Sequence, residues 1–118
     1  IADSQSDKLV LAPGAASTNV FLDKPLAFGI LPPSNKYMEQ AIEALATVNG
    51  AKTIATLWED ASFTRGVCGA APGLAEQYGM TVTSTTEVAT APNVTVLEPI
   101  AETLKGEDPD VVITCVYD

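Results

Sequence analysis

Hydrophobic and polar residues alternate along the chain in blocks typical of a protein built from strands and helices in turn. Short apolar segments rich in β-branched residues favour strands, whereas apolar residues three and four positions apart favour helices. The predicted strands cover residues 8–12, 26–30, 53–58, 80–88 and 111–116. The predicted helices run from the cap Ser34 to Asn49 and Gly50, from about Phe63 to Tyr78, and from near Glu98 to Gly106.

From residue 53 onward the predicted order is strand, helix, strand, helix, strand. Such a run of βαβ units indicates the α/β class, with a Rossmann-like parallel sheet and flanking helices. The segment 111–116 is apolar on both faces, which predicts a central strand of that sheet. The helix after Phe63 contains Gly66 and Pro72, and an interior Pro costs about 3 kcal/mol relative to Ala. We therefore expect a kink or two short helices near Pro72.

Two consecutive prolines, Pro32 and Pro33, separate the first two predicted strands from the later elements. Together with the polar loop after Ala16, they indicate a passage between two bodies. We predict that residues 1–30 form the end of a first lobe and a hinge crossover strand. Residues 31–118 then form the first part of a second lobe.

Composition narrows the class of partner. The chain has 118 residues and a formal net charge of −9, with only six Lys and Arg residues, which are scattered. A nucleic acid or an anionic membrane surface requires clustered positive charge, so both are disfavoured as partners. No apolar run approaches the length of a membrane span.

The absence of His removes much catalytic chemistry. No Ser-His or Cys-His pair can form within this sequence, and the glycine spacing does not match a phosphate-binding loop. We predict a protein that is not an enzyme, with no metal and no cofactor. The two cysteines, Cys68 and Cys115, permit one disulfide and do not require it, and we favour two separate buried thiols.

The segment at residues 11–18 is a candidate ligand site. A predicted strand ends there in a Pro-Gly turn, followed by small residues and hydroxyls. Ligands of open α/β sheets bind beyond the carboxyl ends of strands, and small side chains let a ligand approach the backbone. The candidate contacts are Gly14, Ala15, Ala16 and Ser17. The alternative is an ordinary turn after a strand.

Four stretches, at residues 11–17, 28–34, 58–66 and 108–113, carry a resemblance over essentially the whole chain. In this order and spacing they resemble the type I periplasmic binding proteins, in particular the leucine/isoleucine/valine-binding branch. The same fold serves as the ligand-binding region of some receptors. The resemblance implies a two-lobe fold that closes around a small solute, of which this chain would be the middle.

The resemblance also implies roles for individual residues. First-lobe contacts fall on Gly14 and Ala16, with Ser17 adjacent, and the family commonly has Thr or Ser where this chain has Ala16. A second-lobe aromatic falls on Phe63, where many members have Tyr. A further aromatic falls on Tyr117, with Asp118 beside it.

Each role has a structural alternative. Phe63 at the start of a helix is more often a packing anchor than a ligand wall. The loop residues Glu59 and Asp60 either bind a ligand ammonium or form a solvated acidic loop. The triplet Asn93, Val94, Thr95 fits an N-glycosylation acceptor, a pattern that also arises by chance.

The resemblance implies an extracytoplasmic module that binds an amino-acid-like solute, periplasmic or extracellular in location. Its partners would be that solute and either a membrane transporter of the ABC uptake class or a receptor signalling domain. The alternative is a ligand-free structural or interaction subunit that retains the fold. An enzyme on a doubly wound α/β fold ranks last.

Overall fold

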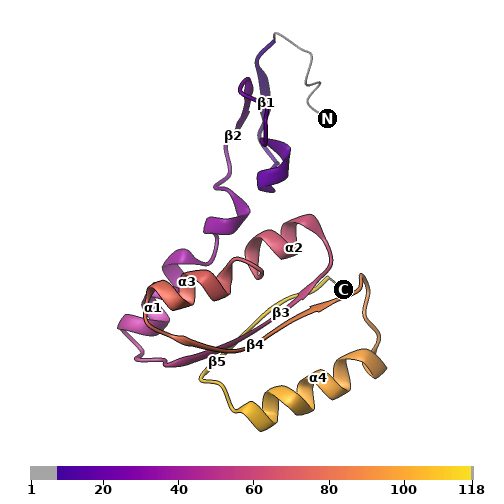
Figure 1. Cartoon of the computed structure of the whole chain (residues 1–118). Coiled ribbons are helices and arrows are strands. Elements are labelled where there is room, and N and C mark those ends of the chain that lie inside the picture. The colour runs from indigo at the N-terminus through magenta and orange to yellow at the C-terminus, as the bar shows by residue number, and fades with distance from the viewer. Residues whose placement is uncertain (1–7, 118) are drawn as a thin grey trace.

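Two separate parallel sheets make up the fold (Figure 1). The computed structural model describes residues 8–117. The elements in chain order are β1 (Val10–Ala12), η1 (Thr18–Val20), β2 (Ala27–Gly29), η2 (Ser34–Lys36), α1 (Glu39–Thr47), β3 (Thr53–Glu59), α2 (Ser62–Val67), α3 (Ala71–Gln77), β4 (Thr81–Val88), α4 (Val94–Glu107) and β5 (Val111–Cys115).

The first sheet contains β1 and β2, which pair in parallel with Leu11 opposite Phe28. Both of these side chains are largely exposed, as is Ile30 just beyond β2. Gly29 lies against the ring of Phe21, and a Cβ at this position would come within 2.7 Å of that ring. A two-stranded sheet of this size is marginal by itself, so its exposed apolar residues mark a surface that needs covering.

The second sheet has the strand order β4-β3-β5, and all pairs are parallel. Strand β3 is central and almost continuously buried. The expectation that residues 111–116 form a central strand is wrong for the described sheet: β5 lies at its edge, and Val112 is 45% exposed. An apolar run therefore identified a strand here without fixing its place in the sheet.

Helices cover both faces of this second sheet (Figure 1). The side that carries α1, α2 and α3 holds the main core, in which Ile42, Ile54 and Ile113 are buried together. On the other side, α4 has no buried residue. Within residues 8–117, none of the helices combines the length and the apolar character that crossing a membrane requires.

The prediction of two short helices near Pro72 is confirmed. The segment divides into α2 and α3, and Pro72 lies in the first turn of α3. Pro is tolerated there because the N–H that it lacks has no intrahelical partner at a helix start.

The prediction that the last helix opens near Glu98 is wrong, because α4 begins at Val94. The side-chain oxygen of Asn93 accepts a hydrogen bond from the Val96 amide at 3.1 Å and caps the helix. Pro99 therefore lies inside the helix and does not mark its start. The cap supplies the start signal that the sequence interpretation assigned to proline.

Ser34 is not the cap of the following helix, contrary to prediction. It begins η2, and α1 starts only at Glu39. Ser34 is fully buried, and its amide donates to the carbonyl of Ala16 at 2.7 Å. A Cβ on Gly66 would lie 2.1 Å from the Ser34 hydroxyl, so glycine at this position lets α2 approach the segment that joins the two sheets.

The cysteines form a disulfide between Cys68 and Cys115, so the preference for two free thiols is wrong. Cys68 follows α2 and Cys115 ends β5. Because α2 packs beside the edge strand, the two Cα atoms come within 6.0 Å. The bond ties α2 to β5 across 47 residues of sequence.

Replacing both Cys68 and Cys115 by Ala should lower the free energy of unfolding by about 2–4 kcal/mol, because the unfolded chain regains the freedom that the cross-link removes. Denaturant unfolding of the oxidised protein measures this loss. The reduced wild-type protein serves as the control and should match the double variant. Equal stability with and without reductant would contradict a structural role for the disulfide.

The amino ends of β3 and β5 are joined by Asp110. One oxygen of its carboxylate accepts hydrogen bonds from the amides of Lys52 and Thr53, at 2.7 and 3.0 Å, and from the Thr53 hydroxyl. The Thr53 hydroxyl oxygen in turn accepts from the Asp110 amide. The backbone hydrogen bond from Lys52 contributes most to lowering the pKa of Asp110 below its ordinary value.

A lowered pKa in the folded state means that Asp110 stabilises the fold above its unfolded pKa of about 3.9. That contribution is lost as the pH falls from about 4 through the folded pKa. Asp110→Asn should therefore be less stable than the wild type at neutral pH and should lose less stability on acidification. Unfolding midpoints measured across this pH range test the prediction.

The matched control is Asp108→Asn, which removes a carboxylate two residues before Asp110. Asp108 has a left-handed backbone conformation, which Asn tolerates. Acid sensitivity should stay at the wild-type level in this variant. The same acid response in Asp110→Asn and in the wild type would show that the Asp110 contacts do not stabilise the folded state.

Candidate functional site

The strand order reverses at β3, between β3 and β5. From β3 the chain crosses to β4 on one side and then returns past β3 to β5 on the other. Ligands of open α/β folds bind at the carboxyl ends of strands where the order reverses in this way. The candidate site therefore comprises the loop after β3 and the end of β5, the edge at which Tyr117 lies.

Glu59 organises this edge. Its side chain is only 4% exposed although it ends β3. One carboxylate oxygen accepts the Ala91 amide at 3.1 Å, and the other accepts the Tyr117 amide at 3.0 Å. The interpretation of Glu59 as part of a solvated acidic loop is wrong, because the carboxylate links the segments that follow three strands.

Asp60, the next residue, pairs with Arg65, which also contacts Glu87 on β4. The hydrogen bond that Arg65 donates to Glu87 and the charges of Asp60 and Glu87 raise the pKa of Arg65. These groups are exposed, and such pairs contribute little stability. The contact pairs one oxygen of the Asp60 carboxylate with Arg65, while the side chain stays exposed.

In the predicted small-residue site after β1, part of the backbone is already hydrogen-bonded within the protein. Gly14 is exposed, while the Ala15 amide donates to Ala12 at 3.1 Å within the turn. Ala16 is buried and its carbonyl accepts the Ser34 amide. The Ala16 carbonyl is therefore bound to the segment that joins the two sheets.

Ser17 makes a contact that the sequence did not indicate. Its hydroxyl lies 2.7 Å from the hydroxyl of Ser62, the first residue of α2. The side-chain amide of Asn19 donates to the same Ser62 oxygen at 3.3 Å. The cap position of α2 is Ala61, and the Thr64 hydroxyl donates to the carbonyls of Glu59 and Ala61.

The two predicted aromatic contacts differ in their surroundings. Phe63 packs edge-on against Tyr37, with ring centroids 5.4 Å apart and planes at 89°. This contact favours the packing role for Phe63. Tyr117 has its amide held by Glu59 while the residue remains 54% exposed. Asp118 lies outside the described residues.

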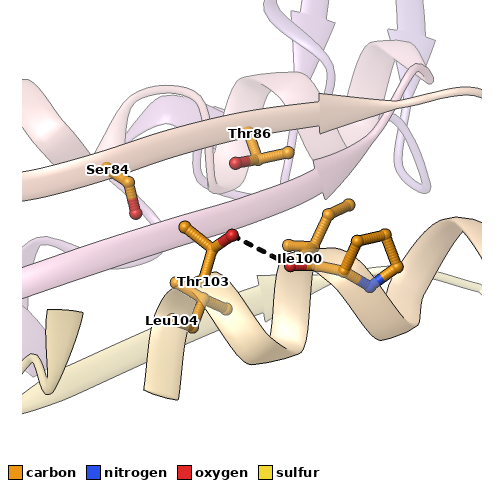
Figure 2. A pocket seen from close by; sticks show the side chains of 6 residues that line it. Ser84, Thr86, Ile100, Thr103 and Leu104 are labelled. Atoms are coloured by element: carbon orange, nitrogen blue, oxygen red, sulfur yellow. Dashed lines mark hydrogen bonds between the residues drawn. The ribbon is translucent and has the colours of Figure 1, made fainter. Parts of the chain in front are cut away.

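Two pockets occur away from these residues. One, of about 190 Å³, separates β4 from α4 and is lined by Ser84, Thr86, Pro99, Ile100, Thr103 and Leu104. Figure 2 shows Ser84 and Thr86 facing Thr103 and Leu104 across it. The other, of about 490 Å³, lies beside the start of α1, at Pro32 and Tyr37. Neither pocket is lined by the predicted ligand residues.

The described residues contain no group of three or more His, Cys, Asp or Glu side chains placed to hold a metal ion. What the candidate site offers instead is an exposed aromatic ring, small residues and neutral hydroxyl and amide groups. In proteins generally, groups of these kinds contact organic molecules through van der Waals contact and hydrogen bonds.

No protein-family profile matches the sequence, and no curated protein sequence matches it significantly. Solved structures match the fold. The leucine-, isoleucine-, valine-, threonine- and alanine-binding protein from Brucella ovis, in a closed conformation, matches with a TM-score of 0.77 and 16% identity. This match covers 93% of this chain and 29% of that protein.

An ABC transporter substrate-binding protein from Desulfitobacterium hafniense in complex with Leu matches with a TM-score of 0.70 and 19% identity, over 90% of this chain and 31% of that one. A solute-binding protein from R. palustris in complex with 4-hydroxybenzoate matches with a TM-score of 0.71 and 19% identity, over 90% of this chain and 28% of that one. The chain thus spans less than a third of these proteins. They confirm the predicted fold, parallel sheets with flanking helices as in type I periplasmic binding proteins.

Glu59→Gln should lower the free energy of unfolding by about 1–3 kcal/mol, because the buried side-chain amide offers only one acceptor oxygen to two backbone N–H groups. Amide hydrogen exchange should accelerate at Ala91 or Tyr117, and chemical denaturation measures the loss of stability. Glu102→Gln, an exposed glutamate on α4, is the matched control and should change neither quantity. Unchanged exchange at both amides would contradict the assigned role of Glu59.

Proposed function

We propose that this chain is the central part of an extracytoplasmic solute-binding protein that closes two lobes around a small organic solute. The observation that carries the proposal is the opposition of two strand ends. The loop after β1 meets the start of α2 after β3 through the Ser17–Ser62 contact, although the strands belong to different sheets. The likeness of fold to substrate-binding proteins supports it.

In this proposal residues 1–30 end the first lobe and supply the hinge crossover strand, and residues 31–118 begin the second lobe. The hinge lies near residues 28–33. A ligand that touches both lobes favours the closed arrangement by the difference between its affinities for the two states.

The ligand contacts would come from both lobes. Gly14, Ala15, Ala16 and Ser17 supply the first-lobe surface, and Phe63, Tyr117 and Asp118 the second. The exposed ring of Tyr117 supports an apolar or aromatic portion in the solute. The related structures were solved with Leu and with 4-hydroxybenzoate, which supports an amino-acid-like or small acidic solute.

The disulfide supports a periplasmic or extracellular location, because such bonds persist in oxidising compartments. The partner of the whole protein would be an ABC uptake transporter or, if the protein is a receptor ectodomain, its signalling domain. No step of this proposal requires a cofactor or catalysis.

A second candidate is a structural or interaction subunit that keeps the fold and binds no solute. The contact between Phe63 and Tyr37 favours it, because a ring already packed within the protein offers less surface to a ligand. The methyl group of Ala16, which cannot donate a hydrogen bond, favours it as well.

The full-length protein should gain thermal stability with at least one member of a panel of amino acids, amides and small aromatic acids. For that solute, Tyr117→Ala should weaken binding about tenfold, because the exposed ring would be a central contact. Titration calorimetry measures the loss.

Tyr117→Phe is the matched control, since it keeps the ring and should bind within about twofold of wild type if the phenol oxygen is not a contact. A panel without any thermal shift would favour the ligand-free subunit.

A further inference from the structure

Within residues 8–117, polar contacts of two opposite kinds join the two sheets. The first is buried: the Ser34 amide donates to the Ala16 carbonyl at 2.7 Å, and Ser34 lies against Gly66. The second is exposed to solvent: the Ser62 hydroxyl lies between Ser17 and Asn19. Water competes for exposed hydrogen bonds and not for buried ones, so the first contact is a fixed pivot and the second can open.

We infer that Ser62 is a positioning residue whose hydroxyl acts as a latch between the lobes, holding the binding protein closed before a ligand arrives. This inference rests on the proposed function. It assigns to Ser62 no contact with the ligand: the hydroxyl acts on the first lobe, through Ser17 and Asn19.

The geometry makes the latch sensitive to small movements. Ser62 lies four residues before Gly66 on α2, which is about 6 Å along a helix. With the pivot at Ser34 and Gly66, a rotation of about 20° moves a group at this distance by about 2 Å. That displacement breaks a hydrogen bond of 2.7 Å. The latch is therefore formed in the closed arrangement and lost in an open one.

The chemistry suits a reversible latch. A hydroxyl can donate one hydrogen bond and accept two, so Ser62 can accept from Asn19 and still share a bond with Ser17. All three groups are neutral, so the latch is insensitive to salt and, in the neutral range, to pH. A neutral exposed pair shifts the equilibrium by a modest factor, roughly two- to tenfold.

By raising the fraction of closed protein, the latch raises the apparent affinity for every ligand. Apparent affinity is reduced by the fraction of protein that is not in the binding-competent state. If Ser62 favours the closed state, loss of its hydroxyl should weaken every ligand by the same factor. A residue that touched the ligand would instead weaken ligands unequally, according to their chemistry.

The test compares Ser62→Ala, Ser62→Thr and Ser84→Ala in the full-length protein. Ser84 is the matched control, because its hydroxyl also makes one exposed hydrogen bond, to Glu107 at 2.6 Å, but within the second lobe. Calorimetry with L-leucine and with 4-hydroxybenzoate measures affinity. Small-angle scattering of the protein without solute measures the separation of the lobes.

Ser62→Ala should weaken both solutes by one common factor of roughly two- to tenfold and should increase the radius of gyration of the unliganded protein. Ser62→Thr, which keeps the hydroxyl, and Ser84→Ala should match the wild type in both measurements. Unequal losses for the two solutes would overturn the latch, because they would place Ser62 against the ligand. An unchanged radius of gyration in Ser62→Ala would overturn it as well.

If neither solute binds the wild-type protein, the proposed ligand class fails while the latch is still decided by scattering. A larger radius in Ser62→Ala alone supports the latch without any ligand. Equal radii in all four proteins reject it.

Discussion

A buried carboxylate held by two backbone amides determines the geometry of the candidate site. Glu59 satisfies its two oxygens with the amides of Ala91 and Tyr117, so the segments that follow β3, β4 and β5 converge on one side chain. At the opposite edge an exposed carboxylate, that of Asp110, joins β5 to the start of β3 through one of its oxygens. The strand β5 is exposed along one side, yet a carboxylate holds each of its ends. Because Tyr117 lies two residues after the end of β5, this restraint also fixes the backbone of that exposed aromatic residue.

The disulfide adds a third restraint on the same strand. Cys115 pairs with Cys68 after α2, and Ser62 begins that helix. The second sheet, α2 and the end of β5 are thus tied into one body, while contact with the first sheet passes through Ser34 and through the exposed Ser62 hydroxyl. Rigid parts joined by few polar contacts are what a hinged clamp requires, because movement then concentrates at those contacts.

Local patterns predicted the elements better than they predicted contacts between them. The β-branched run of β3 and the two helical pieces around Pro72 follow from residues adjacent in sequence, and both appear in the structure. The start of α4 was misplaced, because Pro99 is a stronger sequence signal than the Asn93 cap. The Cys68–Cys115 bond and the burial of Glu59 depend on which segments the fold brings together. No local pattern distinguishes a carboxylate that will bind two distant amides from one that will face water.

The positions of the hydroxyl groups connect the site with its hinge. The resemblance implies a hydroxyl at Ala16 and a phenol at Phe63, and this chain has neither. Its hydroxyls lie one residue away from each position, on Ser17 and Ser62, where they bond to each other across the two sheets. A side chain one residue along a turn or a helix points in a different direction, so the hydroxyls of Ser17 and Ser62 can face each other although Ala16 and Phe63 do not. The hydrogen-bonding groups of both segments are thereby engaged between the two sheets, while the ring of Tyr117 stays exposed at the carboxyl end of β5.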